Sequence, residues 1–425
     1  MSTPVTKIPS RFGYASGLAC RECGQNYDLG AQHACSECFG PLEVGYDLPP
    51  LTREKIEAGP QNIWRYASLL PVPPDVAATP NTEPGCTRLV RADNLARALG
   101  MRALWVKDER GNPTHSFKDR VVAVALAAAV EMGFKVLACP STGNLANAVA
   151  AAAARAGIRS VVLIPADLEQ QKILGTAVYG GTLVTVDGSY DDVNRLASEL
   201  ADTRDDWAFV NVNVRPYYAE GSKTIGYEIA EQLGWRVPQH VVAPMAGGSL
   251  IGKIHKAFGE LHRVGLIDKP NCSIYGAQAT GCNPITHAVK NNLEQHKPVR
   301  KPQTIAKSLA IGDPADGYFA SKVMRDTGGW GEDVDDHEIA EGMMLLARTE
   351  GIWAETAGGV TLAVTQKLIE QGKIPRDEEI VICITGNGLK TQDAIANIVE
   401  QPVVIRPNID DFAAVLEGTR EPVLV

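Results

Sequence analysis

Four cysteines near the start of the chain form two CxxC pairs, Cys20 with Cys23 and Cys35 with Cys38. Eleven residues (24–34) separate the pairs, and four thiolates at this spacing can surround one Zn²⁺ ion tetrahedrally. We therefore expect a structural zinc site on these four side chains. A site that has lost its metal, or a redox pair, is the alternative interpretation.

A lysine, Lys118, stands at the beginning of an apolar segment that is expected to form a helix over residues 117–132. The positive end of a helix dipole disfavours the charged form of an amine. A partly desolvated lysine at such a position can therefore act as a nucleophile. Taken alone, the Lys-Asp-Arg sequence of residues 118–120 is equally typical of a solvated surface.

Two glycine-containing turns each follow an apolar run and precede an expected helix. The first contains Ser141, Thr142 and Asn144, and the second spans residues 244–250. Backbone N–H groups at such strand-to-helix turns bind carboxylates and phosphates, and small residues let the backbone approach the anion closely. Simple helix capping is the alternative for the first turn.

The second turn also resembles a nucleotide-binding P-loop, because residues 247–253 match the first seven positions of that motif. The eighth position should be Ser or Thr to hold Mg²⁺, and it is Ile254 here, which argues against that interpretation. A third turn begins at Thr385, directly after an apolar run. It is either an ordinary turn or a hydroxyl presented at the carboxyl end of a strand, where open α/β sheets bind ligands.

The elements that position these residues alternate between short apolar runs and longer helical segments. Continuous apolar runs are typical of strands that are covered on both faces, so the pattern predicts parallel sheets with helices on either side. The expected strands are residues 103–106, 136–139, 160–164, 182–186, 241–243 and 380–384. The expected helices are residues 117–132, 145–156, 191–201 and 221–233.

Composition narrows the function classes. The 425 residues carry 41 Lys and Arg against 50 Asp and Glu, a net charge of −9, and no basic cluster. Binding to nucleic acid, including through a zinc ribbon, or to an anionic membrane surface is therefore disfavoured. The longest apolar runs are too short to span a bilayer, and the first residues lack the apolar region of a signal peptide. We expect a cytoplasmic location, where cysteines stay reduced.

In their order along the chain, the turns and the lysine segment resemble those of fold-type II pyridoxal-phosphate enzymes, and most of all the threonine synthases. Some members of that family also carry an N-terminal CxxC…CxxC element that ends as residues 40–43 do. The matching segments are residues 94–96, 106–109, 112–120, 141–144, 220–224, 247–248, 276–279, 305–315, 350–352 and 385–386. The resemblance implies a tryptophan synthase β-like fold of two doubly wound α/β lobes, preceded here by the small zinc ribbon.

The resemblance also implies a role for each site residue. Lys118 would bind pyridoxal phosphate covalently and move protons, and Asn144 would hydrogen-bond the 3-oxygen of the ring. Thr385 would face the pyridine nitrogen, while Ser141 and Thr142 would receive the substrate carboxylate. The cofactor phosphate would lie on the backbone N–H groups of Ala246, Gly247, Gly248, Ser249 and Leu250.

The implied reaction converts O-phospho-L-homoserine and water to L-threonine and phosphate, by elimination at Cγ and addition of water at Cβ. Some positions depart from the family pattern. His115 stands where a glycine is common, and Cys86 where an asparagine is common. The family often has an Arg-Leu pair before the Glu-Gly-x-Lys-Thr motif. Here that pair is Tyr218-Ala219. Either Arg215 replaces the missing arginine at the substrate phosphate, or the departure indicates a different leaving group.

The same resemblance suggests a homodimer and three parts of the chain. We expect a zinc-ribbon-like element over residues 1–48, a small α/β domain over 116–215, and a large cofactor-binding domain over 49–115 and 216–425. Two other functions stay open at this point. One is a different fold-type II enzyme, such as cysteate synthase or an amino-acid dehydratase. The other is a non-enzymatic zinc-ribbon protein, with a binding or regulatory role, on a degenerate scaffold.

Overall fold

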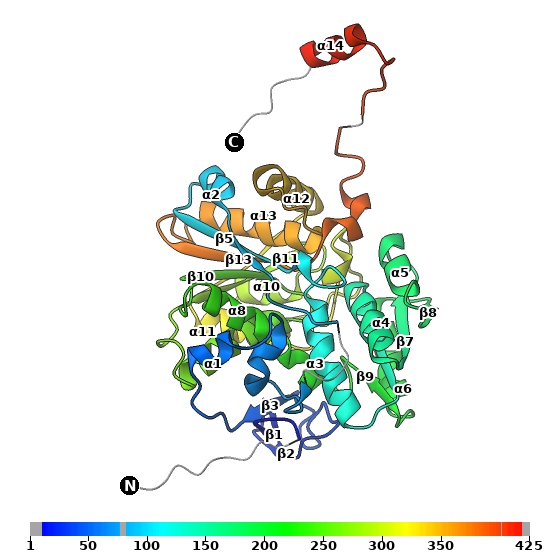
Figure 1. Ribbon diagram of the computed structural model, residues 1–425, viewed down its shortest axis with the longest axis vertical. Coiled ribbons are helices and arrows are strands. Elements are labelled where there is room, and N and C mark those ends of the chain that lie inside the picture. The colour runs from blue at the N-terminus through cyan, green and yellow to red at the C-terminus, as the bar shows by residue number, and fades with distance from the viewer. Residues whose placement is uncertain (1–10, 77–81, 401, 419–425) are drawn as a thin grey trace.

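The chain folds around three separate sheets, and the structure, a computed structural model, describes residues 11–76, 82–400 and 402–418 (Figure 1). The strands are β1 (Ala15–Cys20), β2 (Asn26–Tyr27), β3 (Leu42–Tyr46), β4 (Arg88–Arg91), β5 (Ala103–Asp108), β6 (Val136–Pro140), β7 (Arg159–Pro165), β8 (Thr182–Val186), β9 (Trp207–Phe209), β10 (His240–Pro244), β11 (Ser273–Ala279), β12 (Gly331–Val334) and β13 (Glu379–Ile384). The first three strands form an antiparallel ribbon sheet in the order β2-β1-β3.

The other two sheets are built mainly from parallel strands. The small sheet has the order β8-β7-β6-β9, and the large sheet has the order β12-β11-β10-β13-β5-β4. All neighbours in both sheets are parallel except β4, which pairs antiparallel with β5 at the edge of the large sheet. Every residue of β13 is buried, as its continuous apolar sequence predicts for a central strand.

Helices cover both faces of each of these two sheets. The helices are α1 (Arg53–Glu57), α2 (Asp93–Leu99), α3 (Lys118–Glu131), α4 (Asn144–Ala156), α5 (Gln170–Ala177), α6 (Tyr190–Ala201), α7 (Arg215–Glu220), α8 (Lys223–Gln232), α9 (Ser249–Arg263), α10 (Pro284–Lys290), α11 (Gly317–Asp326), α12 (Asp336–Glu350), α13 (Thr356–Glu370) and α14 (Ile409–Gly418). Short 3₁₀ turns are η1 (Ile63–Leu69), η3 (Glu109–Gly111), η4 (Lys307–Leu309), η5 (Gly388–Lys390) and η6 (Gln392–Ala394). One face of the large sheet packs against α8, α9 and α11, and the other packs against α2, α12 and α13.

The predicted pattern of elements is confirmed. All six expected strands are present, and the four expected helices correspond to α3, α4, α6 and α8. The small sheet packs on α3 and α4 through one face and on α6 through the other. Alanine dominates α3 and α4, and its small side chain lets these helices approach the sheet closely.

The predicted domain limits have clear counterparts among the sheets, although the exact boundaries stay a prediction. The ribbon sheet uses residues 15–46, and residues 1–10 lie outside the described part of the chain. The small sheet uses residues 136–209. The large sheet takes β4 and β5 from before this segment and its other four strands from after it.

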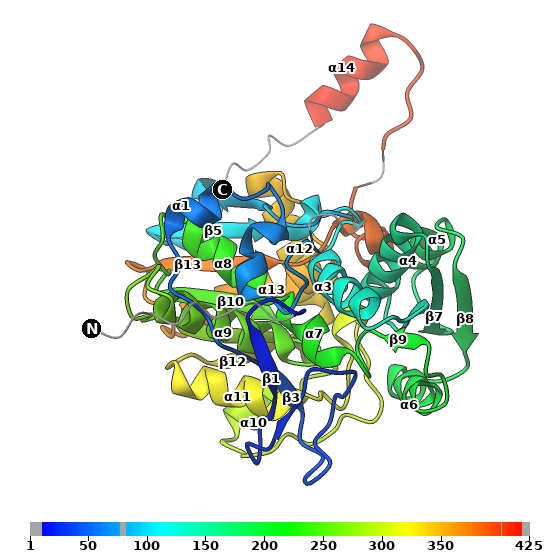
Figure 2. The same ribbon diagram turned by 60° about the horizontal axis from the view of Figure 1, so that its bottom comes forward.

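The ribbon sheet is packed onto the rest of the molecule rather than standing apart. Cys20, Leu42 and Val44 share one apolar core with Val121 of α3 and Tyr217 of α7. Strand β3 lies against α7, as Figure 2 also shows. The ribbon is therefore an integral part of the core beneath α3 and α7.

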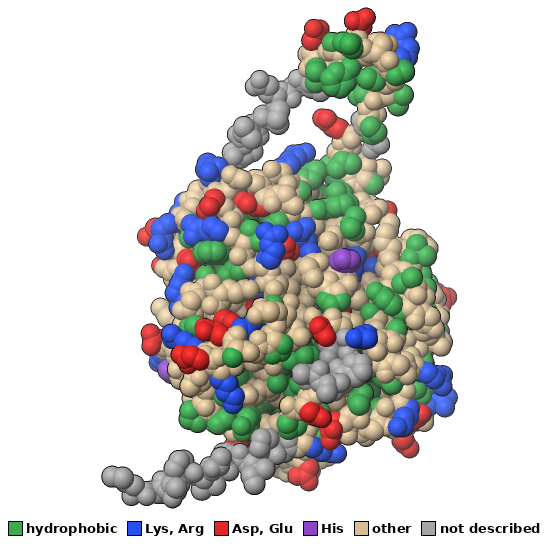
Figure 3. Space-filling model, in the orientation of Figure 1, with side chains coloured by type: hydrophobic (Ala, Val, Ile, Leu, Met, Phe, Trp, Pro, Cys, Tyr) green, Lys and Arg blue, Asp and Glu red, His purple; other side chains and the backbone are tan. Residues whose placement is uncertain are grey.

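The C-terminal helix α14 extends away from the rest of the described chain (Figure 1). Its exposed residues include Ile409 and Phe412, and Figure 3 shows apolar side chains over this helix. Within the described residues, no helix is long and apolar enough to cross a membrane.

Candidate active site

One cavity of about 370 Å³ opens between the small and the large sheet. All of the residues predicted to bind cofactor or substrate line it, a set made up of Lys118, Ser141, Thr142, Asn144, Arg215, Ala246, Gly247, Gly248, Ser249, Leu250 and Thr385. They come from the carboxyl ends of β6, β10 and β13 and from the first turns of α3, α4, α7 and α9. The cavity therefore lies where ligands bind in open α/β sheets.

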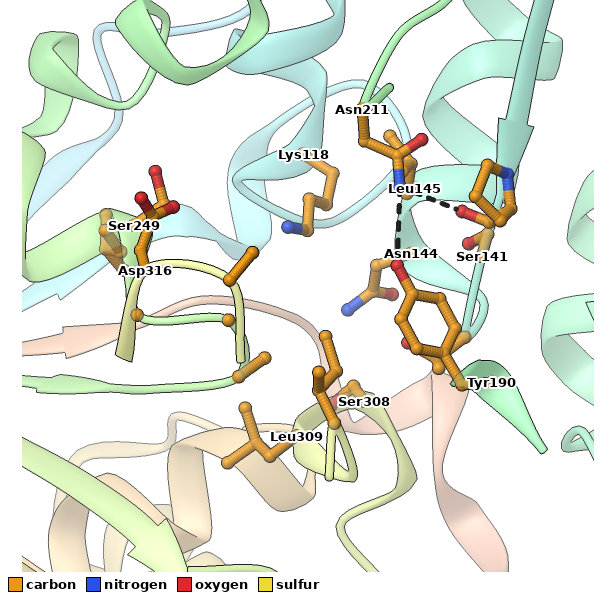
Figure 4. Close-up of a pocket in the computed structure, with 18 of the residues that line it drawn as sticks. Lys118, Ser141, Asn144, Leu145, Tyr190, Asn211, Ser249, Ser308, Leu309 and Asp316 are labelled. Atoms are coloured by element: carbon orange, nitrogen blue, oxygen red, sulfur yellow. Dashed lines mark hydrogen bonds between the residues drawn. The ribbon is translucent and has the colours of Figure 1, made fainter. Parts of the chain in front are cut away.

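Lys118 begins α3, and its amine points into the cavity (Figure 4). Its Nζ donates a hydrogen bond to the Tyr218 hydroxyl at 3.0 Å. Burial lowers the pKa of Lys118 to about 8, although the negative charge of Glu355 acts in the opposite direction. Near neutral pH the amine is therefore still mostly charged, but its neutral form is far more populated than that of an ordinary lysine.

The backbone just before Lys118 is held against the end of β13. The Phe117 N–H donates to the Thr385 carbonyl at 2.9 Å, and the Asn387 N–H donates to the His115 carbonyl at 3.1 Å. His115 has a φ of 64°, in the left-handed region that suits glycine best. This conformation explains why glycine is common there in the family, and it places Lys118 next to Thr385.

The turn before α9 presents unoccupied backbone donors to the cavity. Gly248 caps the helix with a φ of 91°, and no side chain caps its first turn. A Cβ at Gly248 would approach Ala320 Cβ and the Asp316 backbone oxygen at 3.0 Å, whereas one at Gly247 would meet nothing within 4 Å. The first N–H groups of this 15-residue helix therefore have no side-chain cap, and they begin at a turn that lines the cavity, which suits a phosphate group.

The turn before α4 is ordered by Ser141. Its Oγ accepts hydrogen bonds from the N–H groups of Gly143 at 2.9 Å and Ala146 at 2.8 Å. The hydroxyl therefore acts as a cap within the turn, while Thr142 and the remaining N–H groups lie beside the cavity. The Asn211 side chain completes this wall by donating to the Pro140 carbonyl and to the Tyr190 hydroxyl, both at 3.3 Å (Figure 4).

A charged cluster joins the two sheets at the base of the cavity. The Asn144 amide donates to both Glu355 carboxylate oxygens, at 3.0 and 2.8 Å. Lys390 Nζ donates to Asn144 Oδ1 at 3.1 Å, and burial lowers the pKa of Lys390 to about 8. Asn144 is thus already fixed by side chains of the large domain. Its bond to the cofactor ring stays a prediction.

The opposite end of the cavity holds a second charged cluster. Arg215 Nη2 contacts Asp316 Oδ2 at 2.7 Å, and the Asp316 N–H donates to the Gly247 carbonyl at 3.0 Å. His33, from the ribbon, also lines the cavity. Burial and the charge of Arg215 lower the pKa of His33.

Among the residues at the site that were not predicted from the sequence are Tyr218, Asp316, Glu355 and Lys390. The sequence did carry a signal for Tyr218, which occupies the place of an arginine in the Arg-Leu motif. Glu355 follows soon after a family-like segment at residues 350–352. Asp316 directly follows the matching segment at residues 305–315, and Lys390 follows the turn that begins at Thr385. Those segments could have drawn attention to both residues, but their contacts at the site depend on the tertiary fold.

The cavity suits pyridoxal phosphate in its chemistry. It contains a lysine of lowered pKa, an uncapped helix N-terminus for a phosphate, and the buried Thr385 at the end of β13. Ser308 also lines it, and the buried Ser308 hydroxyl has no hydrogen-bond partner among the described residues. A buried polar atom of this kind is usually completed by a ligand or by water.

The four ribbon cysteines lie together as the spacing predicts. Their Sγ atoms are all within 4.8 Å of one another, with Cys20 to Cys38 at 3.5 Å and Cys23 to Cys35 at 3.6 Å. Thiolates bound tetrahedrally to zinc would be about 3.8 Å apart for the usual Zn–S length. The N–H groups of Glu22 and Glu37 point at Cys20 and Cys35 Sγ, each at 3.4 Å, as in metal-binding knuckles.

Comparison with known proteins agrees with this geometry. The chain matches the family of pyridoxal-phosphate-dependent enzymes over residues 81–386. It is 36% identical over 404 residues to the threonine synthase of Methanocaldococcus jannaschii, covering 94% of this chain and 98% of that protein. It is also 36% identical over 406 residues to the threonine synthase of Methanosarcina acetivorans, with the same coverage.

Solved structures share the fold at lower identity. Threonine deaminase isoform 2 of Solanum lycopersicum superposes with a TM-score of 0.60 at 22% identity, covering 74% of this chain and 88% of that one. Maize serine racemase superposes with a TM-score of 0.59 at 22% identity, covering 71% of this chain and 88% of that one. The chain therefore belongs to the fold-type II pyridoxal-phosphate-dependent enzymes and, among them, to the threonine synthases.

Proposed function

We propose that this protein converts O-phospho-L-homoserine and water to L-threonine and phosphate at the cavity around Lys118. The observation that carries the proposal is the placing of Lys118, with its lowered pKa, between two anion-binding helix N-termini. The substrate has a carboxylate and a phosphate, and the cofactor brings a second phosphate. A site with several separate anion-binding elements suits this combination of charges.

We assign the roles as follows. When bound, the cofactor supplies the electron sink that stabilises negative charge on the substrate carbon atoms. The first turn of α9 holds its phosphate, with Ala246 and Leu250 at the ends of the loop, and Thr385 faces its ring nitrogen. The first turn of α4, with Ser141 and Thr142, holds the substrate carboxylate, and Arg215 binds the substrate phosphate.

Lys118 moves the protons. As a neutral amine it would take the proton from Cα and give that proton up again to the bound cofactor and substrate. Once neutral again, it would take a proton from Cβ, so that phosphate can leave from Cγ. It later returns protons as water adds at Cβ. The Tyr218 hydroxyl lies within hydrogen-bond distance of Nζ and keeps the amine pointed at the substrate.

The test is a turnover assay with O-phosphohomoserine in which both phosphate and threonine are measured. Wild type should release the two products in equal amounts. Lys118→Ala should release neither and should lose the absorbance at about 410–430 nm that is typical of the bound cofactor. Lys135→Ala, at an exposed lysine, is the matched control and should behave as wild type. Cofactor absorbance without either product would contradict the proposal and favour another reaction of the same family.

We further propose that Cys20, Cys23, Cys35 and Cys38 bind one structural Zn²⁺ ion. The support is the close grouping of their Sγ atoms and the two N–H groups directed at sulfur. Metal analysis of purified protein should give about one zinc per chain, and Cys23→Ser with Cys38→Ser should remove it. Cys86→Ser, outside the ribbon, is the control. Less than about half a zinc per wild-type chain would contradict the proposal.

We also propose a cytoplasmic homodimer. All nine cysteines are free, which suits a reducing compartment. The exposed apolar side chains of Leu174, in α5, and Val178, directly after it, are candidates for a contact between subunits, with exposed fractions of 59% and 76%. Light scattering should give twice the mass of the 45.5 kDa chain, and a single-chain mass would contradict the homodimer.

A further inference from the structure

The ribbon contributes directly to the wall of the cavity. His33 lies between the two CxxC pairs in sequence, yet it lines the cavity together with Arg215 and Asp316. Arg21, inside the first CxxC pair, reaches the same place, where its Nη1 contacts Asp316 Oδ1 at 3.2 Å. The ribbon thus supplies one side chain, His33, to the cavity wall and a second, Arg21, to Asp316 in that wall.

Two arginines share one carboxylate at this end of the cavity. Asp316 Oδ2 accepts from Arg215 at 2.7 Å, while Asp316 Oδ1 accepts from Arg21. The Arg21 guanidinium is also held over the Phe319 ring, 3.6 Å from its centroid. Arg215 paired with Asp316 alone would have no net charge. With Arg21 added, the cluster has a net charge of +1.

The ribbon is also fixed to the two helices that carry the site. Lys253 of α9 donates to Glu43 of the ribbon at 2.5 Å and to Glu220 of α7 at 2.6 Å. Glu220 in turn accepts from the hydroxyl of Tyr46, also in the ribbon, at 2.6 Å. These contacts define the position of the ribbon relative to Arg215, at the start of α7, and to the phosphate-binding turn of α9.

We propose that the ribbon forms part of the substrate site, with Arg21 as a positioning residue and His33 as a direct contact for the phosphate group of the substrate. This inference rests on the proposed function. The net positive charge of the cluster of Arg21, Arg215 and Asp316 attracts a phosphate dianion. Arg21 also binds Asp316. This leaves one edge of the Arg215 guanidinium, with its N–H groups, free to bind the substrate.

The test compares Arg21→Gln with wild type in the zinc-loaded, cofactor-loaded enzyme. We expect the KM for O-phosphohomoserine and the inhibition constant of inorganic phosphate to rise about tenfold, with kcat within about twofold of wild type. The dissociation constant of the cofactor should not change. Arg348→Gln, at an exposed arginine of α12, is the matched control and should leave all four values unchanged.

A charge-restoring variant makes the test sharper. In Arg21→Gln with Asp316→Asn, Arg215 loses its carboxylate partner and the cluster again has a net charge of +1. This double variant should recover most of the phosphate affinity that Arg21→Gln loses. His33→Ala should also raise the inhibition constant of inorganic phosphate about threefold or more, because it removes a hydrogen-bond donor.

Three outcomes would overturn the inference. The first is an unchanged inhibition constant for inorganic phosphate in Arg21→Gln. The second is a weaker cofactor affinity with phosphate inhibition unchanged, which would assign the cluster to the cofactor. The third is no recovery in the double variant. A wild-type enzyme that does not turn over O-phosphohomoserine would instead contradict the proposed function. In that case the binding of inorganic phosphate, followed through the cofactor absorbance, still tests Arg21.

Discussion

The amine of Lys118 is surrounded by groups that control when it carries a charge. Burial lowers its pKa to about 8, Glu355 acts in the opposite direction, and Tyr218 accepts its hydrogen bond. Only the neutral amine can attack the cofactor carbonyl. The local environment therefore sets the pH range in which the enzyme can be loaded with its cofactor.

The rate of cofactor attachment should follow this pKa. An amine is charged below its pKa and neutral above it, so the rate should rise with pH and be half-maximal near pH 8. In Glu355→Gln the midpoint should move to lower pH, because a group that favours the charged amine is removed. Absorbance of cofactor-free protein mixed with pyridoxal phosphate measures the rate. A midpoint near 10.5, the ordinary lysine value, would contradict this account.

Tyr218 can be tested by removing only its hydroxyl. Tyr218→Phe should lower kcat about 10- to 100-fold while the cofactor stays bound, because Lys118 loses the partner that orients it. Tyr217→Phe is a matched control on the same helix, since its buried ring packs against Phe12 of the ribbon. Steady-state kinetics with O-phosphohomoserine measure both variants. An equal loss in the two would indicate a general effect of α7 on folding.

At the scale of elements, the first turn of α3 is fixed by a buried charged network. Arg120 is fully buried and donates to Glu109 of η3 at 2.6 and 2.9 Å, and to Glu228 of α8 at 2.6 and 2.7 Å. Lys107 of β5 also donates to Glu228, at 2.6 Å. This network connects the helix that carries Lys118 to the large sheet.

Breaking the network should cost substantial stability. Arg120→Met leaves two carboxylates buried without their main partner, which costs about 3–5 kcal/mol of the free energy of unfolding. Arg155→Met, at an exposed arginine of α4, is the control and should change the free energy of unfolding by less than about 0.5 kcal/mol. Urea unfolding measures both. Equal stabilities of the two variants would show that the network is not needed.

The same network predicts acid sensitivity. Arg120 and Lys107 lower the pKa of Glu228 to about 2, although burial alone would raise it. A carboxyl group with a lowered pKa contributes stability above its unfolded value of 4.5, and this contribution is lost as the pH falls towards 2. The free energy of unfolding should therefore decrease below about pH 4.5, with a smaller decrease in Glu228→Gln. The same decrease in both proteins would contradict the assignment.

The sequence predicted the strands that are continuous apolar runs and missed those that are not, for a physical reason. Strands such as β13 are continuous apolar runs, whereas β12 reads Gly-Glu-Asp-Val and looks like a loop. Glu332 and Asp333 are nevertheless buried there, because Lys290 of α10 donates to both. The partner that makes this strand possible is about 40 residues away and leaves no local pattern.

At the scale of the whole molecule, the sequence indicated two lobes and a ribbon but not how they meet. The turns that line the cavity could be predicted because each of them directly follows a single strand and is therefore visible in the local sequence. The contact of Arg21 with Asp316 joins residues 295 positions apart and follows no periodicity. For this reason the sequence favoured a ribbon that only stabilises the chain, while the structure places His33 at the cavity and Arg21 on Asp316 in the cavity wall.

Removing the metal should separate the ribbon from the rest in a measurable way. A strong chelator should let residues 15–46 unfold, because the ribbon sheet is too small to be stable by itself. Hydrogen exchange should then become fast there, while β10 and β13 of the large sheet remain protected. Loss of protection in all three sheets together would show instead that the ribbon and the body unfold as one unit.

The order of the chain has a consequence for synthesis on the ribosome. The ribbon is translated first, but its anchor Lys253 follows Glu43 by 210 positions. At typical translation rates of 5–20 residues per second, about 10 to 40 seconds pass before that helix emerges. During this interval the ribbon lacks its anchor on α9, and the proposed zinc ion is what would keep it folded. Zinc supply during translation should therefore affect the yield of active enzyme more than zinc added afterwards.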